Sequence, residues 1–178
     1  MNAAASDNTG HKPEPRKTKR RPPIETREQA AVYALGETVE GPLVDYLLKG
    51  RGDDRMAVYH AVQAGFPLAD VLRMVNTSEA FRRGGVLAKI IGASDRTLAR
   101  RLQEPARALS AEQSTRALYY AEIMEKATDV LGSRALAEQW LVQPARGLDG
   151  EAPLGLIANA VGVELVNDFL TRMDYGVY

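Results

Sequence analysis

The 178-residue chain has no cysteine and only two histidines. The missing cysteine excludes disulfides, thiolate zinc sites, iron–sulfur clusters and a cysteine nucleophile. No apolar run reaches the roughly 18 residues that a membrane-spanning helix needs. Residues 1–22 also lack the apolar stretch of a secretory signal. These absences predict a cytoplasmic protein that has no membrane partner.

Sequence motifs that would support catalysis are missing as well. The chain has no glycine-rich phosphate loop, no Ser/His/Asp arrangement at motif spacing and no cluster of metal-ligating residues. His11 lies in a basic N-terminal segment, and His60 stands alone in a helical pattern as an ordinary surface or core residue. We therefore predict a protein that is not an enzyme and that binds no cofactor, metal or small-molecule ligand.

The net charge of the whole chain is zero, but its segments are charged. The chain has 23 basic and 23 acidic residues. Residues 1–22 carry a charge of +4, residues 23–72 carry −4, residues 73–107 carry +5 and residues 108–178 carry −5. Such asymmetry suggests different partners for different parts of the chain, and the +5 block is a candidate contact for a polyanion. The alternative is that the blocks are only solvated faces.

Apolar spacing predicts an all-α protein behind a disordered, basic N-terminal tail. Residues 1–23 are rich in proline and basic residues and have no large apolar residue except Met1, so they cannot bury enough surface to fold. The basic cluster at residues 16–21 either follows DNA phosphates or only aids solubility. Residues 24–54 are predicted to be a helical extension that completes the core, forms a dimer or contacts a partner.

About ten helices and no strand are expected from residue 26 onward. The predicted helices cover residues 32–35, 43–48, 53–64, 67–75, 86–91, 94–102, 111–131, 133–141, 153–161 and 163–173. Asp53 and Ser133 are expected to be N-caps, Ser110 and Gln113 form a capping box, and Gly132 ends the long helix. In the helix from Pro153, the side chains of Leu154, Ile157 and Val161 are expected to face inward.

The basic block contains the pattern of a helix-turn-helix between residues 86 and 102. Leu87, Ile91, Leu98 and Leu102 are spaced to fill the core between two helices. Gly92 suits a tight left-handed turn. Ser94 is expected to cap the second helix.

The second helix of this motif carries residues suited to DNA. In a helix-turn-helix this helix enters the major groove, where Arg96 fits a bidentate contact to guanine. Asp95 either accepts from cytosine or only complements the helix dipole. Lys89, Arg100 and Arg101 are suited to phosphate contacts. The full set of candidate DNA-binding residues is Lys89, Ser94, Asp95, Arg96, Thr97, Arg100 and Arg101. The alternative to DNA binding is a helical hairpin whose basic face is only solvated.

Residues 55–118 resemble the Xre-like helix-turn-helix domain of the Xre/MbcA/ParS antitoxins. The shared positions are Gly65-Phe66-Pro67-Leu68, Leu87-Ala88, Ile91-Gly92, Thr97-Leu98-Ala99-Arg100-Arg101-Leu102, Leu109-Ser110-Ala111-Glu112 and Arg116. Residues 119–178 are similar to the small helical toxin-binding domain of that family. There the shared positions are Ala127, Leu131-Gly132, Ala135, Ala137, Trp140-Leu141, Pro144, Leu148, Gly150, Pro153-Leu154, Leu156-Ile157, Gly162, Val166, Leu170, Arg172 and Tyr175-Gly176-Val177-Tyr178.

One segment departs from the family pattern. Family members usually carry an acidic-polar pair and a further acidic residue ahead of the glycine that matches Gly162. This chain has Ala158-Asn159-Ala160-Val161 instead. If those groups normally contact the toxin, this chain contacts it differently.

The resemblance implies the antitoxin of a type II toxin–antitoxin pair, which silences a partner toxin and often represses its own operon. The partner in this family is usually a RES-domain toxin, which resembles ADP-ribosyltransferases and consumes NAD. Operator DNA would be a second partner, and a homodimer is expected because helix-turn-helix proteins match palindromic half-sites. The alternatives are an orphan transcriptional regulator without a toxin, and an interaction protein whose helix-turn-helix no longer binds DNA.

The acidic C-terminal block supports a protein partner there, since it would repel DNA and complement a basic toxin cleft. The candidate toxin-binding residues are Arg172, Met173, Asp174, Tyr175, Gly176, Val177 and Tyr178. Aromatic residues on such a flexible end are good interface anchors, unless they pack on the core of the protein itself. Arg172 either pairs with Asp168 or reaches the toxin. Trp140 is expected to belong to the core.

Overall fold

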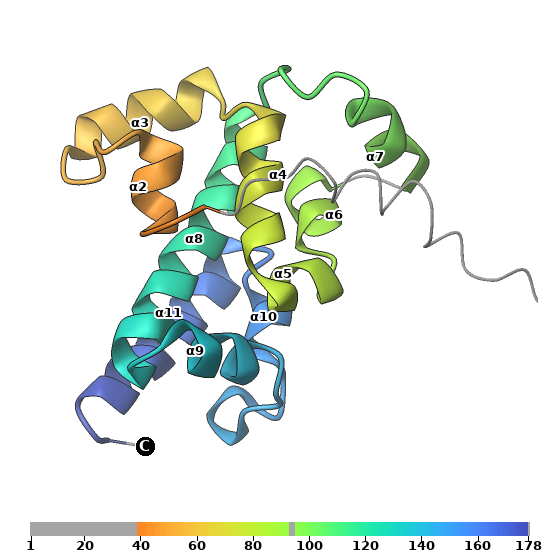
Figure 1. Cartoon of the computed structure of the whole chain (residues 1–178). Helices are drawn as coiled ribbons and strands as arrows, with labels where there is room; N and C mark the ends of the chain where they lie inside the picture. Colours follow the sequence, from red (N-terminus) through yellow and green to blue (C-terminus); the bar gives the residue numbers. More distant parts are fainter. Residues whose placement is uncertain (1–38, 93–94, 178) are drawn as a thin grey trace, which may run out of the picture.

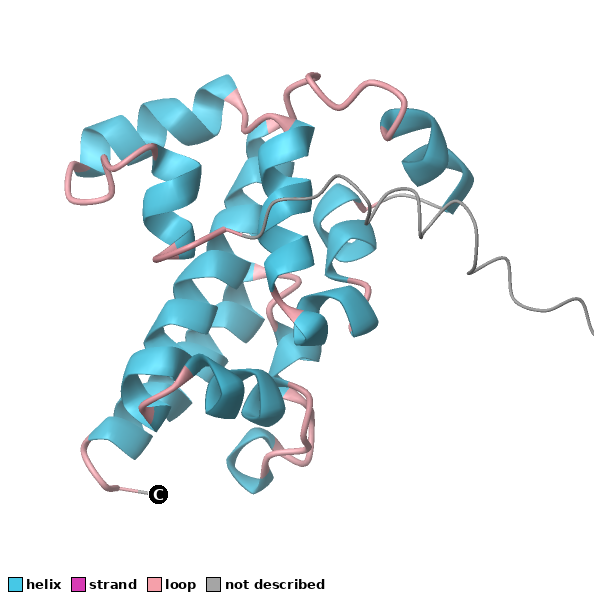
Figure 2. Ribbon diagram, in the orientation of Figure 1, coloured by secondary structure: helices cyan, strands magenta, loops and turns pink. Residues whose placement is uncertain are grey.

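The computed structural model describes residues 39–92 and 95–177, and all regular secondary structure in these ranges is helical (Figures 1 and 2). The predicted all-α class is confirmed. The helices are α2 (Leu43–Leu48), α3 (Arg55–Ala64), α4 (Leu68–Thr77), α5 (Glu79–Arg83), α6 (Val86–Ile91), α7 (Asp95–Arg101), α8 (Ala111–Leu131), α9 (Arg134–Leu141), the 3-10 helix η2 (Arg146–Leu148), α10 (Pro153–Leu156) and α11 (Ala160–Asp174). The predicted N-terminal tail, the helix at residues 32–35, Ser94 and Tyr178 lie outside these ranges.

Helix α8 is the longest described helix and supports both halves of the molecule. It packs against α2, α3 and α6 and also against α9 and α11 (Figure 1). The predicted capping box is present, with the Ser110 hydroxyl accepting from the Gln113 N–H and the Gln113 side chain accepting from the Ser110 N–H. Gly132 ends the helix in the left-handed conformation, which glycine adopts without steric cost.

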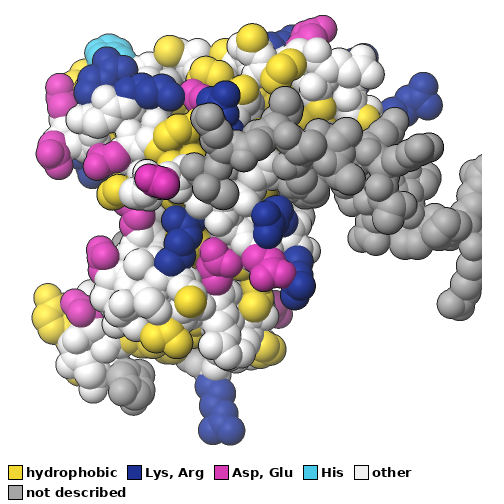
Figure 3. Space-filling view, viewed as in Figure 1, with side chains coloured by type: hydrophobic (Ala, Val, Ile, Leu, Met, Phe, Trp, Pro, Cys, Tyr) yellow, Lys and Arg dark blue, Asp and Glu magenta, His cyan; other side chains and the backbone are white. Residues whose placement is uncertain are grey.

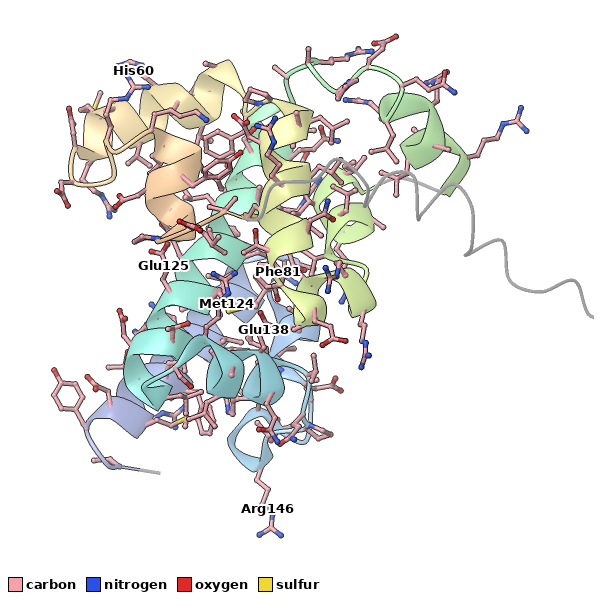
Figure 4. All side chains as sticks on the ribbon, viewed as in Figure 1. His60, Phe81, Met124, Glu125, Glu138 and Arg146 are labelled. Carbon is pink, nitrogen blue, oxygen red and sulfur yellow. The ribbon has the colours of Figure 1, made fainter. Side chains whose placement is uncertain are left out.

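The boundary predicted between residues 118 and 119 lies inside α8. One core of buried side chains extends from Leu43 in α2 to Leu170 in α11. Phe81 of α5 and Met124 of α8 lie near its middle (Figure 4), and the Phe81 ring contacts the Tyr120 ring edge-on at 5.8 Å. The helix-turn-helix region and the C-terminal region therefore share one helix and one core.

Two carboxylates connect elements that are distant in sequence. Helix α2 begins after Pro42, which offers no side-chain cap, and a carboxylate oxygen of Glu125 on α8 accepts from the Val44 N–H at 2.6 Å. Glu138 on α9 accepts from the N–H groups of Glu79 and Ala80 at the start of α5. Both carboxylates, visible in Figure 4, satisfy helix N–H groups that have no intrahelical partner.

The structure corrects several local predictions. Asp54, rather than Asp53, caps α3, since its side chain accepts from two N–H groups of the first turn. The short helix α5, capped by Ser78, was not predicted. The helix predicted for residues 153–161 is interrupted, because the Asn159 side chain accepts from the Gly162 N–H and starts α11 three residues before the predicted start. Val161 consequently lies on α11 and is exposed rather than facing inward.

Within the described ranges, no helix is both long enough and apolar enough to cross a membrane. His60 lies exposed on α3 at the edge of the molecule (Figure 4), beside the ring of Tyr59. The same ranges contain no group of three or more residues arranged to hold a metal ion.

Candidate functional sites

The two helices of the predicted helix-turn-helix are present as α6 and α7. Helix α6 ends at Gly92, whose φ of 64° is the left-handed turn that the sequence predicted. Helix α7 packs against α6 and lies at the periphery of the molecule (Figure 1). Leu98 of α7 and Leu102 just beyond it pack against the core as partly buried residues.

The outward side of α7 carries two of the predicted DNA contacts. Arg96 and Arg100 are exposed, and their spacing of four residues puts both on one face of the helix. Thr97 and Arg101 are half-buried on the same helix. Ser94 and the side chain of Asp95 lie outside the described part of the chain.

Lys89 has different surroundings from the arginines of α7. It is half-buried and, with residues of α5, α9 and α10, lines a groove of about 670 Å³. Burial lowers the pKa of its ammonium group, because desolvation disfavours the charged form. The structure therefore brings Arg96 and Arg100 together and places Lys89 in a groove that faces the C-terminal region.

Helix α8 holds the C-terminal end of α6 through two side chains. The Gln113 amide donates to the Ile91 carbonyl at 2.8 Å, and the Arg116 guanidinium donates to the Ile90 carbonyl at 2.9 Å. These carbonyls end α6 and lack an intrahelical partner. Arg116 also forms an ion pair with Glu112. Arg116 and Gln113 thus hold the C-terminal end of α6 against α8.

The loop after α7 is fixed to the start of α4. The Leu109 N–H donates to the Phe66 carbonyl at 2.9 Å, and the Phe66 N–H donates to the buried Ser114 hydroxyl at 2.9 Å. Gly65 has a φ of 85°, and a Cβ atom there would occupy the space of the Leu109 carbonyl oxygen. Residues 65–68 therefore fix the position of the loop that follows α7.

The C-terminal region presents a stacked set of side chains on α9 and α11. The rings of Trp140 and Phe169 stack with centroids 6.1 Å apart, and the Arg172 guanidinium lies 5.8 Å from the Phe169 centroid. Trp140 is half-buried and packs against the core, partly as expected. The ion pair considered between Arg172 and Asp168 does not occur among the ion pairs of the described residues.

The end of α11 is a hydrogen-bonded turn up to Val177, where the sequence predicted a flexible end. The Val177 N–H donates to the Arg172 carbonyl at 2.9 Å, and the Gly176 N–H donates to the Met173 carbonyl at 3.0 Å. With Gly176 in the left-handed conformation, this is a Schellman motif. Tyr175 and Val177 are exposed, so they do not pack back on the core.

Among the predicted toxin contacts, Asp174 is exposed at the end of α11, whereas Met173 is half-buried and packs against the core. Sequence reasoning missed Phe169, which joins Trp140 to Arg172. A signal was present, because an aromatic residue three positions before an arginine on a helix brings the two side chains together. Gln113 was predicted only as part of a cap, and its contact with α6 had no local signal.

Comparisons with known proteins agree with this architecture. Residues 126–176 match the family model of the antitoxin Xre/MbcA/ParS C-terminal toxin-binding domain. The chain is 26% identical over 119 residues to a protein named Antitoxin Xre from Yersinia enterocolitica, which covers 66% of this chain and 78% of the relative. It is 28% identical over 114 residues to an Antitoxin Xre from Photorhabdus laumondii, which covers 64% of this chain and 75% of the relative.

These matches indicate the class first: the C-terminal end of α8, with α9, η2, α10 and α11, is similar to the toxin-binding domain of an antitoxin. The particular family that this region resembles is that of the Xre/MbcA/ParS antitoxins. The recognition of that family from sequence motifs is confirmed.

Proposed function

We propose that this antitoxin neutralises a RES-domain toxin and represses its own operon through α7, acting as a homodimer in the cytoplasm. The C-terminal region holds the toxin and α7 holds operator DNA. The chain itself performs no catalytic step in this function.

One observation carries the DNA-binding part of the proposal. Arg96 and Arg100 are exposed on one face of α7, and α8 holds the end of the preceding helix α6 through Gln113 and Arg116. An arginine fork recognises guanine or phosphate only when its helix is held in register with the groove. A homodimer follows from the two-fold symmetry of the palindromic sites that such helices read.

The identity of the toxin is supported by the family and by charge. RES-domain toxins are the usual partners of the antitoxins that this chain resembles. A protein that consumes NAD must bind an anionic dinucleotide, which a basic cleft attracts. The acidic balance of residues 108–178 complements such a cleft.

The test is co-expression with the product of the adjacent gene. We expect that product alone to stop growth and lower cellular NAD, and we expect this chain to restore both. The purified chain should also bind a DNA fragment of its own promoter more tightly than a scrambled fragment at the same salt concentration.

Each outcome decides one part of the proposal. Restored growth without promoter binding would overturn the repressor function alone. Promoter binding without restored growth would favour an orphan regulator. Toxicity without a fall in NAD would contradict the RES assignment.

A further inference from the structure

Exposed apolar side chains concentrate on α11 and its end. Val161 is 67% exposed and Leu165 is 50% exposed on the helix, while Tyr175 and Val177 at its end are 77% and 64% exposed. The other large hydrophobic residues exposed in the described ranges, Met56, Tyr59, Leu136 and Val142, lie on α3 or at α9. Figure 3 shows hydrophobic side chains on both the upper and the lower part of the visible surface, and α11 lies mostly behind α8 in this view.

The helical repeat places these residues on one face. Val161, Leu165 and Arg172 are separated by four and seven residues, which is close to one and two turns of an α-helix. The opposite face carries Val166 and Leu170, which are fully buried in the shared core. The face with Val161 and Leu165 therefore points away from α8.

Both ends of α11 are held by local contacts. The Asn159 side chain accepts from the Gly162 N–H at 3.0 Å at the start, and the turn at Gly176 closes the end. At the side of the helix, Phe169 is stacked between Trp140 and Arg172. An apolar surface that is already ordered loses little entropy when a partner covers it.

The charges beside the apolar residues define the partner. Glu164 and Asp168 are exposed on α11 next to Val161 and Leu165, and Arg172 adds one positive charge to the same face, so the partner needs an apolar strip that also offers basic side chains to the two carboxylates.

We infer that the outward face of α11, formed by Val161, Leu165, Arg172 and Tyr175, is a surface that the toxin covers. This inference rests on the proposed antitoxin function and extends the toxin contact beyond the end of the chain. The face lies within residues 126–176, which match a toxin-binding domain, and this continuity favours the toxin over a second copy of the chain.

The test measures the Kd between the full chain and the purified product of the adjacent gene. Leu165→Glu and Val161→Glu place a charge on the face without altering the buried side of α11. Each is expected to weaken binding at least about tenfold, as burial of an unpaired carboxylate in an apolar contact does. Met56→Glu, at a residue that is 61% exposed on α3, is the matched control and should leave the Kd unchanged.

Thermal unfolding of all variants should match the wild-type chain, because the substituted residues are exposed. A Kd for Leu165→Glu and Val161→Glu within twofold of wild type would overturn the inference. Conversion of a wild-type dimer to a monomer by Leu165→Glu, with the Kd unchanged, would also overturn it and would assign the face to a second copy. If the wild-type chain itself does not bind, the antitoxin proposal fails and this inference fails with it.

Discussion

The predicted helix-turn-helix region and the C-terminal region both pack on α8 in one apolar core, and they differ in the hydrogen bonds that α8 adds to this packing. On the first side, Gln113, Ser114 and Arg116 form hydrogen bonds to the backbone of α6 and of the segment before α4. On the second side, Met124 and Ala127 are buried in the same core as Val166 and Leu170 of α11, and Lys126 adds hydrogen bonds to Asn167 and Thr171.

This difference fits what each side is proposed to recognise. Hydrogen bonds are directional, and here they hold the end of α6, which precedes α7 in the chain, and the segment before α4. Apolar packing is non-directional and supports a whole helix whose outer face remains free. In the proposed function, the DNA side presents the charged side chains of Arg96 and Arg100 on α7, and the toxin side presents exposed apolar side chains on α11, whose other face is packed in the core.

The largest expected loss of stability comes from substitution of two glycines, Gly65 before α4 and Gly162 in α11. A Cβ atom at Gly65 would collide with the Leu109 carbonyl, and one at Gly162 would collide with the Leu156 carbonyl. Gly65→Ala and Gly162→Ala should each lower the free energy of unfolding by about 2–4 kcal/mol, measured by urea denaturation. Gly155→Ala is the control, because no atom lies within 4 Å of its Cβ position.

The same experiment tests whether the two regions are one cooperative unit. Because they share α8 and one core, we expect each glycine variant to unfold in a single transition. Two separate transitions, one for each region, would contradict the shared core.

A smaller effect is expected from two buried hydroxyls on α8. Ser114 accepts from the Phe66 N–H, so Ser114→Ala leaves a buried donor without a partner and should cost about 1–3 kcal/mol. The Tyr120 hydroxyl has no hydrogen-bond partner within the described structure, and desolvation raises its pKa to about 12. Tyr120→Phe should therefore change stability by less than about 1 kcal/mol, in the stabilising direction. An equal loss of unfolding free energy in Ser114→Ala and Tyr120→Phe would show that the Tyr120 hydroxyl has a hydrogen-bond partner.

The smallest expected effect is the contribution of Glu125 to the pH dependence of stability. Burial raises the pKa of its carboxyl above the ordinary value of 4.5, and the nearby carboxylates of Asp45 and Asp129 add to the shift, while N–H groups of α2 oppose it. The folded state then binds the proton more tightly than the unfolded state, so stability falls as pH rises from about 4.5 through the raised pKa. Glu125→Gln keeps an oxygen for the Val44 N–H and should flatten this dependence. An unchanged slope of unfolding free energy against pH would contradict the assignment.

The sequence predicted those elements whose signals are local. The capping box at Ser110, the stops at Gly92 and Gly132 and the cap at Ser133 are present in the structure because each depends on residues within one helical turn. The family was also recognisable, since its motifs are spread along both regions.

The remaining features depend either on a local cap that apolar spacing does not reveal or on contacts between distant segments. The helix predicted from Pro153 to Val161 is interrupted because the Asn159 side chain caps α11 at the Gly162 N–H, where Gly162 also approaches the Leu156 carbonyl closely. Lys89 looked like a phosphate contact by residue type, yet its position is set by the packing of α6 near α9 and α10. The contacts from Gln113 and Arg116 to α6 span more than twenty residues.

The central claim is that DNA and the toxin bind to separate regions of this protein, α7 and the end of α11. Two variants test this claim most directly. Affinity for the promoter and for the adjacent gene product is measured for the Arg96→Ala, Arg100→Ala double variant and for a deletion of residues 174–178. The double variant should lose at least about tenfold in promoter affinity and keep its toxin affinity within twofold, whereas the deletion should do the reverse. A deletion that keeps its toxin affinity, or a variant that loses both affinities while remaining folded, would contradict the claim.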